Sequence, residues 1–202
     1  MIISSWNIRG LNRSTKQKEV NKLISNNKID MIGILETKVK TGKEAHIQKC
    51  MMPLWDFISN SKCDSFNRIW VAWNPHKIKI RVLRETRQLI HLNVFDIQLN
   101  KYLEVTYVYG LHTSSERREL WKDLCNIASS SQGLPWITLG DFNEVLEPQE
   151  ISGGNPKRDP GMEEFSNCLY QACLVDLRYT GIYFTWSNRR FDRDHFIERK
   201  LD

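Results

Sequence analysis

Five β-like segments follow one another in the middle of the chain and limit the folds open to it. Val, Ile, Tyr and Trp are frequent in them, and turn residues such as Asn74-Pro75 separate them. These strands are predicted over residues 55–59, 69–73, 78–83, 89–97 and 102–109. Consecutive strands without long crossovers pair as antiparallel neighbours, so a regular Rossmann-type alternation is excluded.

Helix signals and further short strands flank this block. Ser14 and Gln17 have the spacing of a capping box before a helix over Thr15 to Asn26, and Thr113 and Glu116 repeat the spacing. Asp159 and Pro160 form an N-cap and first helical position for a helix over residues 161–171. The remaining strands are predicted over residues 2–7, 31–35, 136–139, 174–177, 183–187 and 196–201.

The order of these elements predicts a mixed α/β (α+β) fold. Two mainly antiparallel β-sheets packed face to face, with helices on their outer faces, accommodate strands that alternate with helices only at the two ends of the chain. The result is a four-layer sandwich. With 202 residues, the chain is expected to form a single domain over residues 1–202.

Charge and cysteine usage restrict the class of protein. Residues 9–49 carry ten Lys or Arg against four Asp or Glu, while the whole chain is only +5. This local excess suits a polyanion such as DNA, and it equally suits a solvated helix face. Five cysteines without a C-x-x-C pair favour reduced thiols over a zinc site or a disulfide framework. We expect an intracellular protein, nuclear or cytoplasmic and not secreted, without a membrane partner.

Polar side chains stand where the predicted strands end. They are Asn7, Glu36, Tyr109, and the pair Asp141 and Asn143. Each alone has an ordinary explanation, such as a turn residue, a solvated strand end, a core aromatic or an Asx-turn. Their joint order along the chain favours a functional site.

The motifs that carry these residues resemble a known set. WNIRG, ILETK, VYG and LGDFN, followed by FTW and KLD, are similar to the successive motifs of the endonuclease/exonuclease/phosphatase superfamily with the DNase I-like fold. The stretches IWVAWNP, ERRELW and GIYFTWSN most resemble the endonuclease domain of plant non-LTR (LINE-type) retrotransposons. The resemblance implies a Mg²⁺-dependent hydrolase that nicks DNA, linked in full-length relatives to a reverse transcriptase domain.

Phosphodiester hydrolysis assigns roles to three of these residues. Glu36 is the candidate anchor of Mg²⁺, for which Mn²⁺ is a substitute, as the resemblance also implies. Asp141 would orient or deprotonate the attacking water. Asn143, two residues later on the same strand face, would donate its amide to the developing oxyanion.

Other residues are assigned supporting roles. Asn7 would assist the metal or the phosphate, and the Tyr109 hydroxyl would donate to a phosphate oxygen. The resemblance implies DNA contacts from Thr185 and from exposed arginines, for which ordinary solvated side chains are the alternative. The arginines are Arg9, Arg189 and Arg190, with Arg193 in the same loop as the last two. Trp186 fits either the core or a wall of the DNA groove.

The chain departs from the family pattern at its end. The pattern continues into a Ser-Asp-His motif and further strands beyond Asp202, whose match in the family orients the catalytic histidine. Neither His112 nor His195 is expected to replace that histidine. We therefore expect a truncated domain with impaired activity, and two alternatives remain: a catalytically dead DNA-binding relic, or a phosphatase of the same superfamily.

Overall fold

The computed structural model describes residues 1–40, 42–63, 67–131, 133–190, 192 and 195–201. The strands of the two larger sheets are β1 (Ile3–Asn7), β2 (Met31–Leu35), β3 (Asp56–Ser59), β4 (Ile69–Trp73), β5 (Ile78–Glu85), β6 (Leu89–Asp96), β7 (Lys101–Tyr109) and β8 (Trp136–Asp141). The helices are α1 (Ser14–Asn27), α2 (Glu44–Met51), α3 (Ser114–Ser130) and α4 (Pro160–Gln171), with a 3-10 turn, η1, at Pro148–Glu150. Three short strands complete the chain: β9 (Ile151–Ser152), β10 (Trp186–Ser187) and β11 (Glu198–Arg199).

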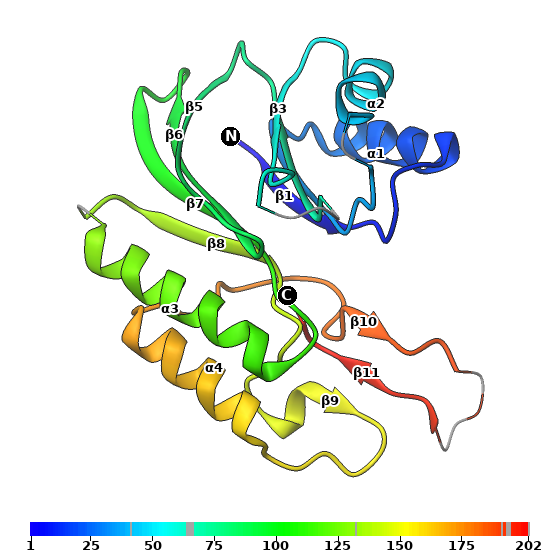
Figure 1. The fold of residues 1–202 in the computed structure, drawn as a ribbon, viewed down its shortest axis with the longest axis vertical. Helices are drawn as coiled ribbons and strands as arrows, with labels where there is room; N and C mark the ends of the chain where they lie inside the picture. Colours follow the sequence, from blue (N-terminus) through cyan, green and yellow to red (C-terminus); the bar gives the residue numbers. More distant parts are fainter. Residues whose placement is uncertain (41, 64–66, 132, 191, 193–194, 202) are drawn as a thin grey trace. The chain divides into compact units, whose positions relative to one another are not determined.

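The chain divides into two compact units. The first comprises Met1–Tyr109 with Gly133–Asp141, and the second comprises Gly110–Gln132 with Phe142–Asp202. The first unit contains two four-stranded sheets, ordered β1-β2-β4-β3 and β5-β6-β7-β8 (Figure 1). Within them β1 and β2 are parallel, as are β7 and β8, and every other neighbouring pair is antiparallel. The predicted mixed α/β fold with two packed, mainly antiparallel sheets is confirmed.

A shared apolar core holds the two sheets together. Met31, Val71 and Trp73 from one sheet belong to the same buried cluster as Ile90 and Val105 from the other. A close contact crosses this core at Gly33, where an added Cβ would lie 2.1 Å from Cδ1 of Tyr107. Tyr107 is fully buried, so its ring takes the volume that a larger residue on β2 would need.

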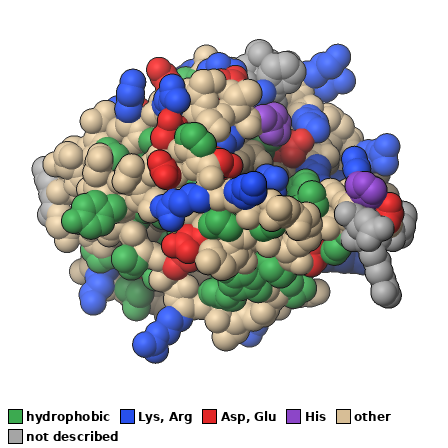
Figure 2. Space-filling model, turned by 90° about the horizontal axis from the view of Figure 1, so that it is seen from below, with side chains coloured by type: hydrophobic (Ala, Val, Ile, Leu, Met, Phe, Trp, Pro, Cys, Tyr) green, Lys and Arg blue, Asp and Glu red, His purple; other side chains and the backbone are tan. Residues whose placement is uncertain are grey.

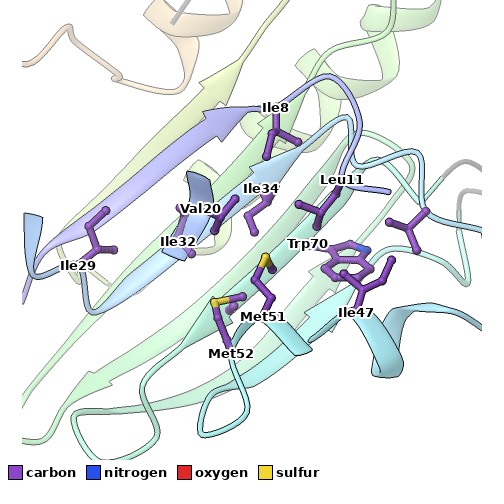
Figure 3. Close-up of a cluster of buried hydrophobic side chains, with 12 residues drawn as sticks. Ile8, Leu11, Val20, Ile29, Ile32, Ile34, Ile47, Met51, Met52 and Trp70 are labelled. Carbon is purple, nitrogen blue, oxygen red and sulfur yellow. The ribbon is translucent and has the colours of Figure 1, made fainter. Parts of the chain in front are cut away.

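Helices α1 and α2 cover the opposite face of the β1-containing sheet. Val20 of α1 and Ile47 and Met51 of α2 pack against Ile32 and Trp70 of the sheet (Figure 3). Each helix therefore buries one apolar stripe and exposes most of its charged residues, although Glu44 of α2 is buried.

The second unit is built on a pair of helices and a small sheet. Trp121 of α3 stacks on Phe165 of α4 with ring centroids 4.7 Å apart, and Arg118 pairs with Glu164 at 2.9 Å. The sheet has the order β10-β11-β9. Trp186 packs against a buried cluster of Val145, Met162 and Leu201, so the core interpretation of Trp186 fits its surroundings.

Several expectations about individual elements are wrong. The predicted strand over residues 174–177 is absent although the structure describes these residues, because its apolar side chains are exposed and have no neighbouring strand; Val175 is 83% exposed. The last two predicted strands shrink to two residues each in β10 and β11. Ser14 does not cap α1: the N-cap is Arg13, without a side-chain hydrogen bond, and Gln17 donates instead to the Leu11 carbonyl.

The other two helix starts are confirmed. Thr113 accepts a hydrogen bond from the Glu116 amide at 3.3 Å, and Asp159 accepts one from the Met162 amide at 3.0 Å. Over the described residues, none of the helices has the length and apolar character that crossing a bilayer requires.

Candidate functional site

Two pairs of parallel strands deliver polar residues to the site. Asn7 ends β1 and lies opposite Leu35, so the next residue, Glu36, emerges beside it. Tyr109 ends β7 and lies opposite Asp141, the last residue of β8. Because parallel strands end at the same sheet edge, each pair brings two candidate residues together without any long loop.

A hydrogen bond joins the two pairs. Nδ2 of Asn7 donates to Oδ2 of Asp141 at 2.7 Å, and Oδ1 of Asn7 accepts from the backbone N–H of Arg9 at 3.2 Å. The side chain of Asp141 is enclosed, since the residue is only 5% exposed. Both ends of the Asn7 amide are therefore engaged, and Asn7 orients the Asp141 carboxylate.

Glu36 already faces a cation. The Lys38 ammonium lies 2.6 Å from Oε1 of Glu36, whose side chain is 18% exposed while that of Lys38 is 57% exposed. Sequence reasoning gave no role to Lys38, although it stands inside the quoted ILETK motif. The signal that identifies it is its place two residues after the carboxylate; in the structure Lys38 is in the left-handed region, at φ 53°.

The residues of this site suit a hard divalent ion. Carboxylate oxygens are preferred ligands of Mg²⁺, which is commonly held by one or two carboxylates and completes its shell with water and substrate phosphate. Glu36 offers such an oxygen beside the Asn7–Asp141 pair. Among the described residues there is no group of three or more His, Cys, Asp or Glu placed to hold a metal.

Tyr109 and Gly140 are held by close backbone packing. Tyr109 is 2% exposed, and its amide donates to the Gln88 carbonyl at 2.9 Å. Gly140, at φ 141°, brings its backbone so near β7 that a Cβ would lie 2.1 Å from the Val108 carbonyl oxygen. Only glycine fits there, so the residue before Asp141 fixes where β8 ends.

Asn143 belongs to the second unit and differs from the expectation. The strand ends at Asp141, and Asn143 is in the left-handed region at φ 52°, so the two residues do not share a strand face. Nδ2 of Asn143 donates to the Gly110 carbonyl at 2.6 Å. In this unit Asn143 closes a contact between two turns, because a Cβ on Gly110 would lie 2.2 Å from the Phe142 carbonyl oxygen.

The remaining residues predicted to contact DNA are exposed where the structure describes them. Thr185 is exposed and its hydroxyl accepts from the Leu201 amide at 3.1 Å. Arg9, Arg189 and Arg190 are also exposed, whereas Arg193 and Asp202 lie outside the described residues. On the face shown in Figure 2, Lys and Arg side chains stand among acidic and apolar ones and do not form one block.

This chain is similar to known proteins in sequence and in fold. The sequence profile of the Endonuclease/Exonuclease/phosphatase family matches residues 4–202. No curated protein sequence matches the chain.

Solved structures share the fold. The endonuclease domain of TRAS1, a telomere-specific non-LTR retrotransposon, superposes with a TM-score of 0.71 at 11% identity, over 98% of this chain and 81% of that one. D. rerio TDP2 complexed with a single-strand DNA product gives 0.62 at 12% identity, over 98% and 80%. A humanized D. rerio TDP2 with 14 mutations gives a TM-score of 0.55 at 15% identity; the superposition covers 70% of this chain and 61% of that one.

At such low identities these structural similarities establish a common DNase I-like fold and nothing finer. The sequence match is the stronger finding, because it runs through all of the strand-end motifs. On that ground the chain belongs to the Endonuclease/Exonuclease/phosphatase family, whose members hydrolyse phosphodiesters and phosphate esters.

Proposed function

We propose that this chain is a DNA-nicking endonuclease domain of the retrotransposon type that depends on Mg²⁺, with Mn²⁺ as a substitute. The observation that carries the proposal is the Asn7–Asp141 hydrogen bond beside Glu36. This hydrogen bond orients the enclosed Asp141 carboxylate, and Glu36, one residue beyond the strand partner of Asn7, carries a second carboxylate that pairs with Lys38.

Each residue of the first unit has a distinct task in this proposal. Glu36 holds the divalent ion, which would neutralise charge on the phosphate oxygens and stabilise the leaving alkoxide. Asp141 accepts a proton from, or orients, the attacking water. Asn7 keeps the Asp141 carboxylate in place through its amide.

Substrate contacts are assigned by resemblance and remain predictions. Arg9 and the exposed Arg189 and Arg190 would neutralise backbone phosphates, which gives affinity without sequence preference. Asn143, Thr185 and Tyr109 would donate to phosphate oxygens, and Asp202 would orient a catalytic histidine. A plant LINE-type origin, with a reverse transcriptase domain in the full-length protein, is part of the same proposal.

The test is a nicking assay on supercoiled plasmid with MgCl₂. Wild type should convert supercoiled to open-circular DNA at the low rate expected of an impaired domain, and EDTA should abolish the conversion. Asp141→Ala should lower the rate by about 10²- to 10⁴-fold, the usual contribution of a general base. Glu19→Gln is the control, because it removes the charge of a carboxylate that lies exposed on α1 and pairs with Lys16.

The same preparations separate the alternatives. A gel-shift assay that detects plasmid binding by wild type without any nicking would favour the DNA-binding relic. Hydrolysis of inositol phosphates by wild type, lost in Asp141→Ala, without nicking of the plasmid would favour a phosphatase. Equal nicking by wild type and Asp141→Ala would contradict the proposed site.

A further inference from the structure

The loop that carries Glu36 has an unusual backbone. Glu36 and Lys38 are both in the left-handed region, at φ 55° and 53°, although neither is glycine. Residues with a Cβ adopt this conformation at a cost and keep it only where surrounding structure determines it. Contacts with neighbouring residues must therefore stabilise the left-handed backbone of Glu36 and Lys38.

Direct tethers bind the loop to two neighbouring segments. The Glu36 amide donates to the Arg68 carbonyl at 2.6 Å, and the Thr37 hydroxyl donates to the Asn67 carbonyl at 2.5 Å. On the other side, the Leu11 amide donates to the Thr37 carbonyl at 2.8 Å. Thr37 is fully buried, so its hydrogen bonds are shielded from competing water.

Asn67 is the centre of these tethers. It is fully buried and left-handed, at φ 49°. Its Oδ1 accepts from the Trp70 indole at 2.8 Å, and its Nδ2 donates to Oε1 of Glu44 at 3.0 Å. The other carboxylate oxygen of Glu44 accepts from the Gly42 amide. Asn67 is thus linked to Thr37 through its backbone carbonyl and to Gly42 through the buried Glu44 carboxylate.

We infer that Thr37, Asn67 and Glu44 are positioning residues that set the affinity of Glu36 for a divalent cation. The inference rests on the proposed function, since it takes Glu36 as the metal anchor. None of the three touches the carboxylate of Glu36; they act by fixing its backbone. Outer partners of metal ligands commonly change metal affinity by about 10- to 100-fold when they are lost.

A merely structural network would give a different result, and a matched pair of variants separates the two. Thr37→Val keeps the shape of the side chain and removes the hydroxyl donor, whereas Thr37→Ser keeps the donor. Thr106→Val is the control: Thr106 is equally buried in the same unit, and its hydroxyl accepts from the Trp136 indole at 2.7 Å, but it has no bond to the loop.

The experiment titrates the full chain with MnCl₂ and follows free Mn²⁺ by electron paramagnetic resonance, with melting temperatures measured in EDTA. Thr37→Val should weaken Mn²⁺ binding by about 10- to 100-fold, and Thr37→Ser should bind as wild type does. Thr106→Val should melt at a lower temperature and keep wild-type affinity. Should Thr37→Val fail to fold, Glu44→Gln should weaken binding in the same direction.

The outcomes that overturn the inference differ from those that overturn the function. Wild-type Mn²⁺ affinity in both Thr37→Val and Glu44→Gln, with affinity lost in Glu36→Gln, would remove the positioning role and leave the metal site intact. Equal loss in Thr37→Val and Thr106→Val would mean that general loosening is responsible. Equal Mn²⁺ affinity in wild type and Glu36→Gln would overturn the metal site and the inference together.

Discussion

Replacing the amide of Asn7 by a carboxylate tests the link between the two sheets. In the native protein Nδ2 of Asn7 donates to Asp141 at 2.7 Å, and Asp141 is 5% exposed. Asn7→Asp has nearly the same shape but turns this donor into a second acceptor. Two carboxylates so close cannot both stay ionised, so the pair should take up one proton and its pKa should rise.

Two contributions set how much Asn7→Asp lowers the free energy of unfolding. Loss of a hydrogen bond to a charged group costs about 1.5–3 kcal/mol. The repulsion is limited, because the pair can always bind a proton at a cost of about 1.4 kcal/mol for each pH unit above the ordinary Asp pKa of about 3.9. That limit is about 5 kcal/mol at pH 7.5 and below about 1 kcal/mol at pH 4.5, where the protonated carboxyl also restores a donor.

The sign of the pH dependence is therefore fixed. A carboxyl pair whose pKa is raised on folding is stable when protonated and loses stability as pH rises through that pKa. Asn7→Asp should lower the free energy of unfolding by about 2–5 kcal/mol at pH 7.5 and by about 1 kcal/mol or less at pH 4.5.

Urea unfolding in EDTA at pH 4.5, 6.0 and 7.5 measures this difference. Asn126→Asp is the matched control, because it makes the same chemical change at an exposed position of α3. The reasoning is refuted if Asn7→Asp and Asn126→Asp unfold at the same urea concentration at every pH.

Three further changes test other parts of the structure. Gly33→Ala would place a Cβ 2.1 Å from the Tyr107 ring and should cost about 3 kcal/mol in urea unfolding, so an unchanged midpoint would contradict the packing. Lys38→Gln removes the ion-pair partner of Glu36 and should tighten Mn²⁺ binding by about 2- to 5-fold, because an ion pair this exposed contributes at most about 1 kcal/mol. Weaker Mn²⁺ binding would show that Lys38 does not compete with the metal. Burial lowers the pKa of His91 below its ordinary value of 6.5; Glu104 opposes this shift and Arg84 adds to it. The free energy of unfolding should therefore fall as pH drops below 6.5, because the unfolded chain binds the proton more readily than the folded one. His91→Gln should flatten this pH dependence in urea unfolding.

The strands of the first unit were predictable because burial leaves a strong pattern in the sequence. Residues 31–35 and 69–73 are apolar on both faces, and the structure forms strands with these bounds. Such runs end sharply at a polar residue, so Glu36 was placed correctly at the end of its strand. Exposed apolar residues such as Val175 gave a similar local pattern, but a strand forms only where another strand offers hydrogen bonds.

The geometry of the site was harder to predict from the sequence, because it depends on contacts between segments that are distant along the chain. Asn7 and Asp141 are 134 residues apart, and no local pattern specifies that one donates to the other. The same holds for Asn67, whose buried position follows from the pairing of β2 with β4. The prediction that Asn143 shares a strand face with Asp141 was wrong for a local reason. β8 ends at Asp141 and Asn143 is left-handed, which breaks the two-residue periodicity of a strand.

Several non-glycine residues of the candidate site adopt left-handed backbone conformations. Glu36 directly follows β2, whereas Lys38 and Asn143 lie three and two residues after a strand end, and Arg9 lies two residues after Asn7; all four are in the left-handed region. Glycine adopts this conformation without the steric cost that a Cβ imposes. Residues with a Cβ adopt it at an energetic cost. Substituting glycine at Lys38 should therefore raise the free energy of unfolding relative to Lys38→Ala, because glycine relieves the strain that alanine retains; the opposite order would show that the turn is not strained.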